Sequence, residues 1–426
     1  MKIREKGLPP KEIAQMLGRM LQDDLTFTSG RIVGSMCTEP ARFARRLYSK
    51  YLGKNLGDPG LFPGTAKLEA ECIATIGNLL SHSNAAGSLV SGGTEANIMA
   101  LWSAKKNSKV ERPEAIVPIS AHHSFDKAAD LLGVELVKVP TDVMGRIDVK
   151  KVKSSITPNT IMMLGIAGTT DLGVIDPITE LSEIAEANNT HLHVDASFGG
   201  FVIPFLRELR YDVEDFDFRL AGVSSISIDP HKMGMAPVPA GTILFRDIAM
   251  LERINIVADY LAGGEASKVT LLGTRPGAAA IVLWSMLNLF GMQGYRRIVK
   301  RCMNLTYLLY EESQRMNGVK PVQEPTINIL GLKPLRSSPQ QVAKELRVKG
   351  WAVSAFPKHL RICVMPHVRK KDILEFAKAL DLLEKTEKII VRAGSNYMTL
   401  ADKAKMHKYQ YSFLYANDLH PRAWLA

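Results

Sequence analysis

Hydrophobic and polar positions change their spacing repeatedly along the 426-residue chain. From about residue 67, short runs rich in β-branched residues alternate with stretches in which apolar positions recur every three or four residues. This alternation is typical of a parallel sheet covered by helices. The predicted strands are 115–120, 134–140, 160–168, 191–196, 224–229 and 241–246. The pattern therefore predicts α/β architecture with a mostly parallel central sheet.

A second, smaller pattern follows a helix predicted at 295–316. Here strands are expected near 325–331, 351–356 and 360–365, and helices near 338–349 and 370–385. A chain of this length exceeds what one hydrophobic core normally serves, so two structural units are expected. The predicted parts are an N-terminal segment (1–60), a large domain (61–290), a small C-terminal α/β domain (291–386) and a tail (387–426) without a sustained period, which stays unassigned.

Composition narrows the class of protein. The hydrophobic fraction is 46% and the charged fraction 23%, as in an ordinary globular protein. The excess of 54 basic over 43 acidic residues gives a net charge of +11, which suits nucleic acid, anionic substrates or solubility. The basic residues are spread along the chain without one long run, so a nucleic-acid partner is disfavoured.

Cellular location follows from the same inspection. The first ten residues lack the apolar core of a secretory signal, and the longest apolar run, 278–290, is too short to span a membrane. The four cysteines are scattered without a CxxC pair, which favours a reducing compartment. We expect a cytoplasmic protein with free thiols.

One glycine-rich stretch, Ser91-Gly92-Gly93-Thr94, stands where a strand-like run gives way to a helix. Free backbone N–H groups and the helix dipole at such a start attract an anion, and a phosphate group would fit. An ordinary turn with Thr94 as the helix cap explains the same residues equally well.

Two more strand ends carry polar side chains. His122 and His123 lie at a strand-to-helix junction, where an imidazole either stacks on a flat ring or satisfies the helix start. Asp195 ends a buried run, and a carboxylate at that depth is costly unless a cation or a strong donor pairs with it. A structural salt bridge is the alternative explanation for Asp195.

Lys232 follows Asp229-Pro230-His231 between two runs that indicate buried strands. A desolvated lysine near other cations loses its proton more readily and becomes a nucleophile for a carbonyl carbon, as Schiff-base chemistry requires. An anion site, a flat-ring stacker, a deep carboxylate and a nucleophilic lysine are together what pyridoxal 5′-phosphate needs from a protein. The residues therefore predict this cofactor.

A metal site is the competing interpretation of the histidines. His191, His193 and Asp195 alternate on one face of a strand and, with His122 and His123, could act as ligands. That interpretation leaves Lys232 and the glycine-rich turn unexplained, so no metal is predicted.

Six motifs in order, SGGTEAN, AHHSFDKAA, GTTDLG, HVDASFGG, DPHKMG and GTRPG, resemble the group II pyridoxal-phosphate amino-acid decarboxylases. The resemblance covers about residues 1–386 and is strongest to the archaeal L-tyrosine/L-aspartate decarboxylase branch. It implies the fold of the type I pyridoxal-phosphate transferases. It also implies a homodimer with shared active sites, in which segment 1–60 packs on the partner.

The resemblance assigns roles residue by residue. Lys232 would form the Schiff base, Asp195 would pair with the pyridinium nitrogen, and His122 would stack on the ring. The remaining cofactor contacts would come from Gly93, Thr94, Thr169, Thr170, Ser197, His231 and Thr274, the last from or near the partner subunit with Arg275.

Two residues are assigned to the substrate and to proton transfer. Arg361 matches the small-domain arginine that holds the substrate carboxylate, and a planar guanidinium suits that group. Tyr260 aligns with a tyrosine on a mobile loop that would protonate the product carbon, and Gly263-Gly264 would let that loop close.

The implied reaction is decarboxylation of an L-amino acid, of L-aspartate to β-alanine or of L-tyrosine to tyramine, feeding coenzyme A or methanofuran biosynthesis. Glutamate decarboxylation, a pyridoxal-phosphate enzyme acting on aminoacyl-tRNA, and a non-catalytic dimeric binding protein stay open. No motif fixes the side chain of the substrate.

Overall fold

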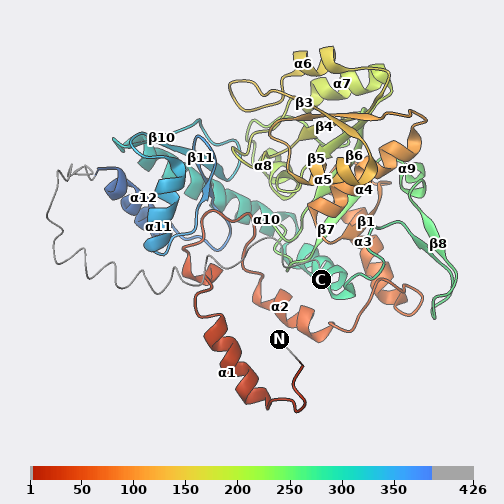
Figure 1. Cartoon of the computed structure of the whole chain (residues 1–426), viewed down its shortest axis with the longest axis horizontal. Helices are drawn as coiled ribbons and strands as arrows, with labels where there is room; N and C mark the ends of the chain where they lie inside the picture. Colours follow the sequence, from red (N-terminus) through yellow and green to blue (C-terminus); the bar gives the residue numbers. More distant parts are fainter. Residues whose placement is uncertain (1–2, 386–426) are drawn as a thin grey trace. The chain divides into compact units, whose positions relative to one another are not determined.

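The computed structural model describes residues 3–385, and these residues group into a single unit by their contacts (Figure 1). The predicted tail, 387–426, lies outside the described residues. The division of the chain at residues 60 and 290 stays a prediction.

A seven-stranded sheet forms the centre of the large part, in the order β1-β7-β6-β5-β4-β2-β3. Strands β2 to β6 run parallel, while β7 runs antiparallel to both β6 and β1. The bounds are β1 Ala86–Val90, β2 Glu114–Pro118, β3 Glu135–Val139, β4 Thr160–Ile166, β5 His191–Asp195, β6 Val223–Ile228 and β7 Gly241–Phe245. The six predicted strands are therefore confirmed, each within a few residues of its predicted ends.

Helices cover both faces of this sheet, because side chains alternate between the faces of each strand. On β2, Ala115 and Val117 pack in the core cluster of helices α4 and α5, whereas Ile116 packs in the cluster of α3, α7 and α10. The helices are α3 Pro63–Leu79, α4 Gly93–Asn107, α5 Ser124–Leu132, α6 Val149–Ser155, α7 Ile178–Asn188, α8 Ile203–Glu208, α9 Ile248–Glu252 and α10 Gly277–Gln314.

The C-terminal part is an antiparallel four-stranded sheet in the order β10-β11-β13-β12, with two helices. Its bounds are β10 Val319–Pro321, β11 Ile329–Pro334, α11 Pro339–Val348, β12 Ser354–Ala355, β13 Leu360–Cys363 and α12 Lys370–Lys385. A buried pair, Trp351 and Phe376, packs edge to face in its core. The first predicted strand of this region begins later than expected, at Ile329, and the second is reduced to Ser354–Ala355.

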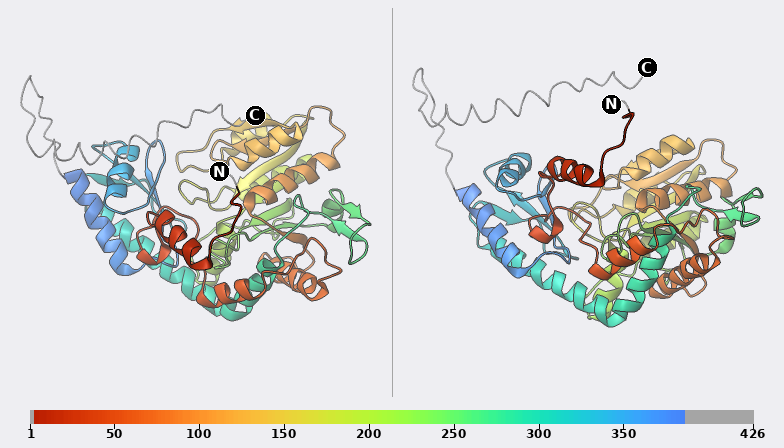
Figure 2. Two further views of the ribbon diagram at one scale, coloured as in Figure 1. Left: turned by 60° about the horizontal axis from the view of Figure 1, so that its bottom comes forward. Right: turned by 90° about the horizontal axis from the view of Figure 1, so that it is seen from below.

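Helix α10 connects the two parts and passes along one side of both (Figure 2). It joins the apolar run 278–290 to the helix predicted at 295–316, across a non-helical residue, Gly291, at φ 52°. Among the described helices it alone is long and apolar enough to cross a membrane by length and composition. Its apolar residues instead pack on α3, α8 and α12, which is how a core helix uses such a surface.

The N-terminal segment divides into a part that packs and a part that does not. Helix α2, Arg42–Lys50, packs on α10 through Ala44, whereas α1, Pro10–Met20, has no buried residue and projects from the rest of the chain (Figure 1). Between them, Ile32 bridges Ala352, and the Cys363 N–H donates to the Val33 carbonyl (2.7 Å). The segment around Val33 is thus bound to the small sheet.

Candidate active site

A cavity of about 330 Å³ opens where the strands β4, β5 and β6 end and helix α4 begins. Ligand sites in open α/β sheets form at this edge because the loops after parallel strands converge there. Eight of the predicted cofactor residues line the cavity, namely Gly93, Thr94, His122, Thr170, Asp195, Ser197, His231 and Lys232.

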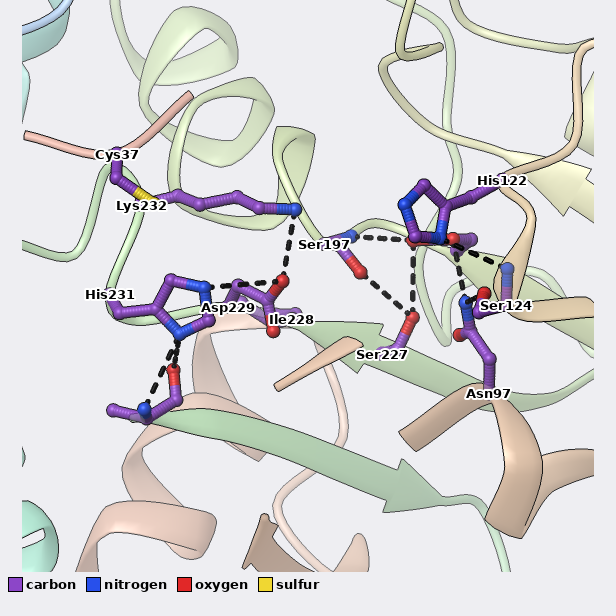
Figure 3. Close-up of polar contacts among 12 residues, drawn as sticks. Cys37, Asn97, His122, Ser124, Ser197, Ser227, Ile228, Asp229, His231 and Lys232 are labelled. Atoms are coloured by element: carbon purple, nitrogen blue, oxygen red, sulfur yellow. Dashed lines mark hydrogen bonds and ion pairs between the residues drawn. The ribbon is translucent and has the colours of Figure 1, made fainter. Parts of the chain in front are cut away.

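Lys232 lies at the floor of the cavity, with its side chain 18% exposed. Its Nζ is 2.9 Å from Asp229 Oδ2 (Figure 3). Burial alone would lower the pKa of the Lys232 ammonium, but the carboxylates of Asp229 and Asp195 outweigh it and raise that pKa above its usual value. The sequence suggested cationic neighbours and a lowered pKa, and that expectation is wrong, because the nearest charged groups are carboxylates.

Asp229 has one free buried oxygen. Its Oδ2 bonds to Lys232 and lies 3.7 Å from His231 Nε2, whereas Oδ1 is buried without a hydrogen-bond partner in the described chain. Buried carboxylate oxygens are normally paired, so this cavity residue can still accept a hydrogen bond.

Asp195, the last residue of β5, receives three hydrogen bonds. Asn97 Nδ2 donates to its Oδ2 (2.9 Å), while the Ser197 N–H (3.0 Å) and Ser227 Oγ (3.3 Å) donate to its Oδ1. Burial would raise the pKa of this carboxyl, but the charge of Lys232 and the donors of Ser197 lower it overall. Asp195 is therefore ionised at neutral pH and can face a cationic group of a ligand.

The start of helix α4 forms the opposite wall. The N-cap is Gly92 and no side chain caps the helix, so the alternative in which Thr94 caps an ordinary turn is not what the structure has. The first N–H groups of a helix lack intrahelical acceptors and are available to an anion. A Cβ on Gly93 would lie only 2.4 Å from Ser197 Oγ, so a larger residue here would have to displace that hydroxyl.

His122 and His123 lie in tilted contact, with ring centroids 3.9 Å apart, but only His122 lines the cavity. Its Nδ1 accepts a hydrogen bond from the Ser124 N–H (3.3 Å). Burial lowers the pKa of His122, so its ring is neutral at neutral pH. A flat, neutral imidazole at this wall fits a stacking role.

Four predicted residues lie elsewhere. Thr169 is buried below the cavity, where its Oγ1 accepts from the Val174 N–H (3.2 Å). Tyr260 is 83% exposed in the connection between the short strands β8, Ile256–Ala258, and β9, Ala266–Lys268. Thr274 precedes Arg275, whose guanidinium donates to the Leu89 carbonyl (2.7 Å). None of these lines the cavity of its own chain.

The fourth, Arg361 on β13, connects three segments. Its Nη1 donates to the Thr170 carbonyl (2.8 Å), and its Nη2 donates to the Gly34 carbonyl (2.6 Å) and to Ser354 Oγ (2.9 Å). Its Nε is buried and has no hydrogen-bond partner in the described chain. A substrate-binding role for Arg361 stays a prediction.

The histidines of β5 make hydrogen bonds rather than metal contacts. His191 Nε2 and His193 Nδ1 lie 2.7 Å and 2.8 Å from the same atom, Ser225 Oγ. Within residues 3–385, no three His, Cys, Asp or Glu side chains form a group able to hold a metal ion.

Two polar residues that line the cavity, Asp229 and Asn97, have no role predicted from the sequence. Asp229 stands three residues before Lys232 in the DPHKMG motif, and an acidic residue one turn from a buried lysine was a usable signal. Asn97 gave none, because it reaches Asp195 from a helix 98 residues away in sequence.

These residues fit pyridoxal phosphate. An ionised carboxylate, an anion-binding helix start, a neutral imidazole and a lysine amine face one cavity, and Asp229 Oδ1 still lacks a donor. They match the ring nitrogen, the phosphate, the ring face and the aldehyde of this cofactor.

Comparison with known proteins agrees with this fit. The model of the pyridoxal-dependent decarboxylase conserved domain matches residues 46–329. The chain is 48% identical over 380 residues to the L-aspartate/L-glutamate decarboxylase of Pyrococcus horikoshii, covering 89% of this chain and 99% of that protein. It is 47% identical over 351 residues to a probable L-tyrosine/L-aspartate decarboxylase of Methanothermobacter thermautotrophicus, covering 82% and 96%. Among solved structures, a sphingosine-1-phosphate lyase from Burkholderia pseudomallei matches with a TM-score of 0.83 and 26% identity, covering 98% of this chain and 97% of that one.

Fold and site together define an enzyme that uses pyridoxal phosphate and has the type I fold of that class. Within this class, the chain belongs to the pyridoxal-dependent decarboxylase family, the group II amino-acid decarboxylases. It is a carboxy-lyase that removes the carboxylate of an amino acid as carbon dioxide.

Proposed function

We propose that the preferred substrate is L-aspartate, which would give β-alanine. Both relatives described above have L-aspartate in their names, whereas L-glutamate and L-tyrosine each appear in only one. The net charge of +11 also favours an anionic amino acid, because a positive protein field raises the local concentration of anions. L-Tyrosine and L-glutamate are the second and third candidates.

The observation that supports decarboxylation at this site is that Lys232, Asp229 and Asp195 meet in one cavity opposite the start of α4. In our assignment Lys232 holds the aldehyde carbon of the cofactor, Asp195 holds the ring nitrogen and His122 covers the ring. The N–H groups at Gly93 and Thr94, with His231, hold the phosphate.

When bound, pyridoxal phosphate accepts into its ring the electrons of the broken Cα–carboxylate bond. Asp195 keeps a proton on the ring nitrogen, because its own ionised form is the stable one in this site. The proton that Cα must gain would come from the hydroxyl of Tyr260, the residue that the resemblance assigns to this step. Each turnover then consumes one proton and one amino acid and releases one carbon dioxide and one amine.

A second copy of the chain is proposed to complete the site. Tyr260 is 83% exposed, and α1 has no buried residue although Ile13, Leu17 and Met20 are exposed on it. An apolar stripe of this kind needs a partner surface. In a homodimer, Tyr260 and the turn with Thr274 would lie against the cavity of the partner.

The product would define the cellular role, which we place in the cytoplasm. β-Alanine would supply coenzyme A biosynthesis, and tyramine would supply methanofuran biosynthesis. Both roles depend on which amine the enzyme forms.

The substrate test is to incubate the holoenzyme with an equimolar mixture of the twenty amino acids and to identify the amines by mass spectrometry. We expect β-alanine to accumulate fastest, and faster release of tyramine or of 4-aminobutyrate would overturn the assignment. If no amine forms from protein that carries bound cofactor, binding of tRNA at rising salt tests the aminoacyl-tRNA alternative.

Lys232→Ala is the test of the site. We expect loss of the visible absorbance of the bound cofactor and of all amine formation. Lys138→Ala, on the exposed side of β3, is the matched control and should leave both unchanged. Amine formation by Lys232→Ala would refute the assignment.

Mixing two inactive variants tests the shared site. If Tyr260 acts across the dimer, refolding Lys232→Ala with Tyr260→Phe in equal amounts should restore about a quarter of the wild-type activity, because half of the dimers carry one intact site. If Tyr260 acts within its own chain, every site carries one defect and no activity returns.

A further inference from the structure

Three polar side chains, His191, His193 and Asp195, alternate on the buried strand β5 and therefore share one face of the sheet. Three such groups in a core are costly unless each has hydrogen-bond partners. The partners are Ser225 on β6, which pairs with His193 in the sheet register, and Asn97 on helix α4. All five side chains are buried.

Together they form a continuous hydrogen-bonded chain. Asn97 Nδ2 lies 2.9 Å from Asp195 Oδ2, and Asn97 Oδ1 lies 3.0 Å from His193 Nε2. His193 Nδ1 lies 2.8 Å from Ser225 Oγ, which lies 2.7 Å from His191 Nε2. The hydrogen-bonded chain begins at Asp195 in the wall of the active-site cavity and ends at His191, four residues earlier on the same strand and about 13 Å along it.

The donor and acceptor of every hydrogen bond in this series follow from the charge of Asp195. An ionised Asp195 only accepts, so the amide nitrogen of Asn97 faces it, and that nitrogen also donates to Ser124 Oγ (2.9 Å). The amide oxygen therefore faces His193, which must carry its proton on Nε2. Burial lowers the pKa of His193 to about 4, so the ring is neutral at pH 7 and its Nδ1 is bare.

The rest of the chain is fixed by the same logic. Since His193 Nδ1 is bare, the single hydrogen of Ser225 points to it, and Ser225 Oγ must then accept from His191 Nε2. Each donor thus points toward Asp195. Aligned donors polarise one another and stabilise negative charge at the end of the chain.

We propose that Asn97 and His193 are positioning residues that keep the Asp195 carboxylate ionised and oriented toward the pyridine nitrogen of bound pyridoxal phosphate. The proposal rests on the proposed role of Asp195. A residue that hydrogen-bonds to a ligand-binding side chain, without touching the ligand, commonly sets the orientation and the basicity of that side chain. A carboxylate with weaker support would take the proton itself and leave the ring nitrogen neutral.

The substitutions His193→Gln and His193→Asn separate a hydrogen-bond role from a packing role. The amide nitrogen of glutamine can take the place of Nε2 and still donate to Asn97, whereas that of asparagine reaches only the place of Nδ1. The control is His82→Gln. His82 Nε2 also bonds to a carbonyl oxygen, that of Arg246 (2.9 Å), but His82 is not part of the hydrogen-bonded chain that leads to Asp195.

The readout is the ¹⁵N chemical shift of the pyridine nitrogen in holoenzyme loaded with ¹⁵N-labelled cofactor. We expect a protonated nitrogen in the wild type, in His193→Gln and in the control, and a shift toward the unprotonated value in His193→Asn. The dissociation constant of the cofactor should rise about tenfold in His193→Asn and less than about threefold in His193→Gln. Equal effects of the two substitutions, or none, would overturn the proposal.

Two further measurements keep the test decisive. The ¹⁵N spectrum of histidine-labelled wild-type protein without cofactor should show His193 as the Nε2–H tautomer. The Nδ1–H tautomer or a cationic ring would refute the proposed direction of the hydrogen bonds. The substitution Asp195→Asn tests the proposed role of Asp195 itself, which is to keep the pyridine nitrogen protonated. If its pyridine nitrogen stays protonated, the role of Asp195 fails; if only His193→Asn has no effect, the inference alone fails.

Discussion

Lys232 and Asp229 form a close ion pair that alters the chemistry of the lysine. Nζ and Oδ2 are 2.9 Å apart, and the neighbouring carboxylates raise the pKa of the lysine. Only the unprotonated amine attacks an aldehyde, so a raised pKa favours the unreactive, protonated form of Lys232. Binding of the cofactor must change this pair before the covalent bond can form.

Asp229→Asn should accelerate covalent loading at neutral pH. Without the nearest carboxylate the pKa of Lys232 falls, and each unit of that fall gives on the order of ten times more free amine. The measurement is the rate of absorbance change at saturating pyridoxal phosphate between pH 6 and 10. Asp126→Asn, at an exposed ion pair with Lys138, is the control, and an unchanged pH profile for Asp229→Asn would contradict the expectation.

At the scale of elements, the start of α4 depends on the absence of one side chain. A Cβ at Gly93 would press on Ser197 Oγ at 2.4 Å and on Asp229 Oδ2 at 3.1 Å. Gly93→Ala should therefore weaken cofactor binding about tenfold while the chain still folds. The control is Gly64→Ala in α3, where a Cβ meets no atom within 4 Å. Equal cofactor affinity of the two variants, measured by fluorescence titration, would count against the close fit.

A buried aspartate connects strand β4 to the loop before α6. Asp176 accepts from the N–H groups of Ile147 (2.7 Å) and Ile166 (2.8 Å), and burial raises its pKa to about 7. A raised native pKa contributes stability that is full below the unfolded pKa and is lost as pH rises to the native one. The contribution of Asp176 should therefore decline between about pH 4 and pH 7.

The comparison with Asp176→Asn, which cannot ionise, measures that decline. The wild-type free energy of unfolding, minus that of Asp176→Asn, should fall by on the order of 3 kcal/mol between pH 4 and pH 8. Urea denaturation at both pH values gives the difference. A difference that stays constant, or increases with pH, would show that Asp176 is ionised in the folded chain.

The central sheet was predictable because a buried parallel strand is apolar on both faces and stands out in sequence. The two-stranded ribbon of β8 and β9 was missed because its strands are three residues long and exposed at Ile256 and Val257. The same limit applies to the site. Motif spacing gave the residues at strand ends, but the support of Asp195 by Asn97 depends on helix packing that no local pattern records.

At the scale of the whole molecule, Arg361 joins the small sheet to the loop after β4 and to the N-terminal segment. Arg361→Met should lower the free energy of unfolding by about 2–4 kcal/mol, because the buried Gly34 carbonyl and the partly buried Thr170 carbonyl lose a charged donor. If Arg361 also holds the substrate carboxylate, KM should rise at least about tenfold.

Arg301→Met is the control for this comparison. Arg301 on α10 also donates to a small-domain carbonyl, that of Val368 (3.3 Å), whereas Arg361 also donates to Thr170, a residue that lines the cavity. We expect Arg301→Met to lower stability without changing KM. An unchanged KM in Arg361→Met would limit Arg361 to a structural role and remove it from the substrate site.

The attachment of the N-terminal segment to the small sheet has a consequence for synthesis of the protein. The segment near Val33 bonds to Ala352 and Cys363, more than three hundred residues later in the chain, and it carries Met36 to the cavity wall. A nascent chain on the ribosome can fold its central sheet long before those late residues emerge. The segment with Met36 is therefore synthesised early but reaches its place in the cavity wall only late. A chain interrupted before residue 352 would contain the catalytic lysine but would lack this wall of the cavity.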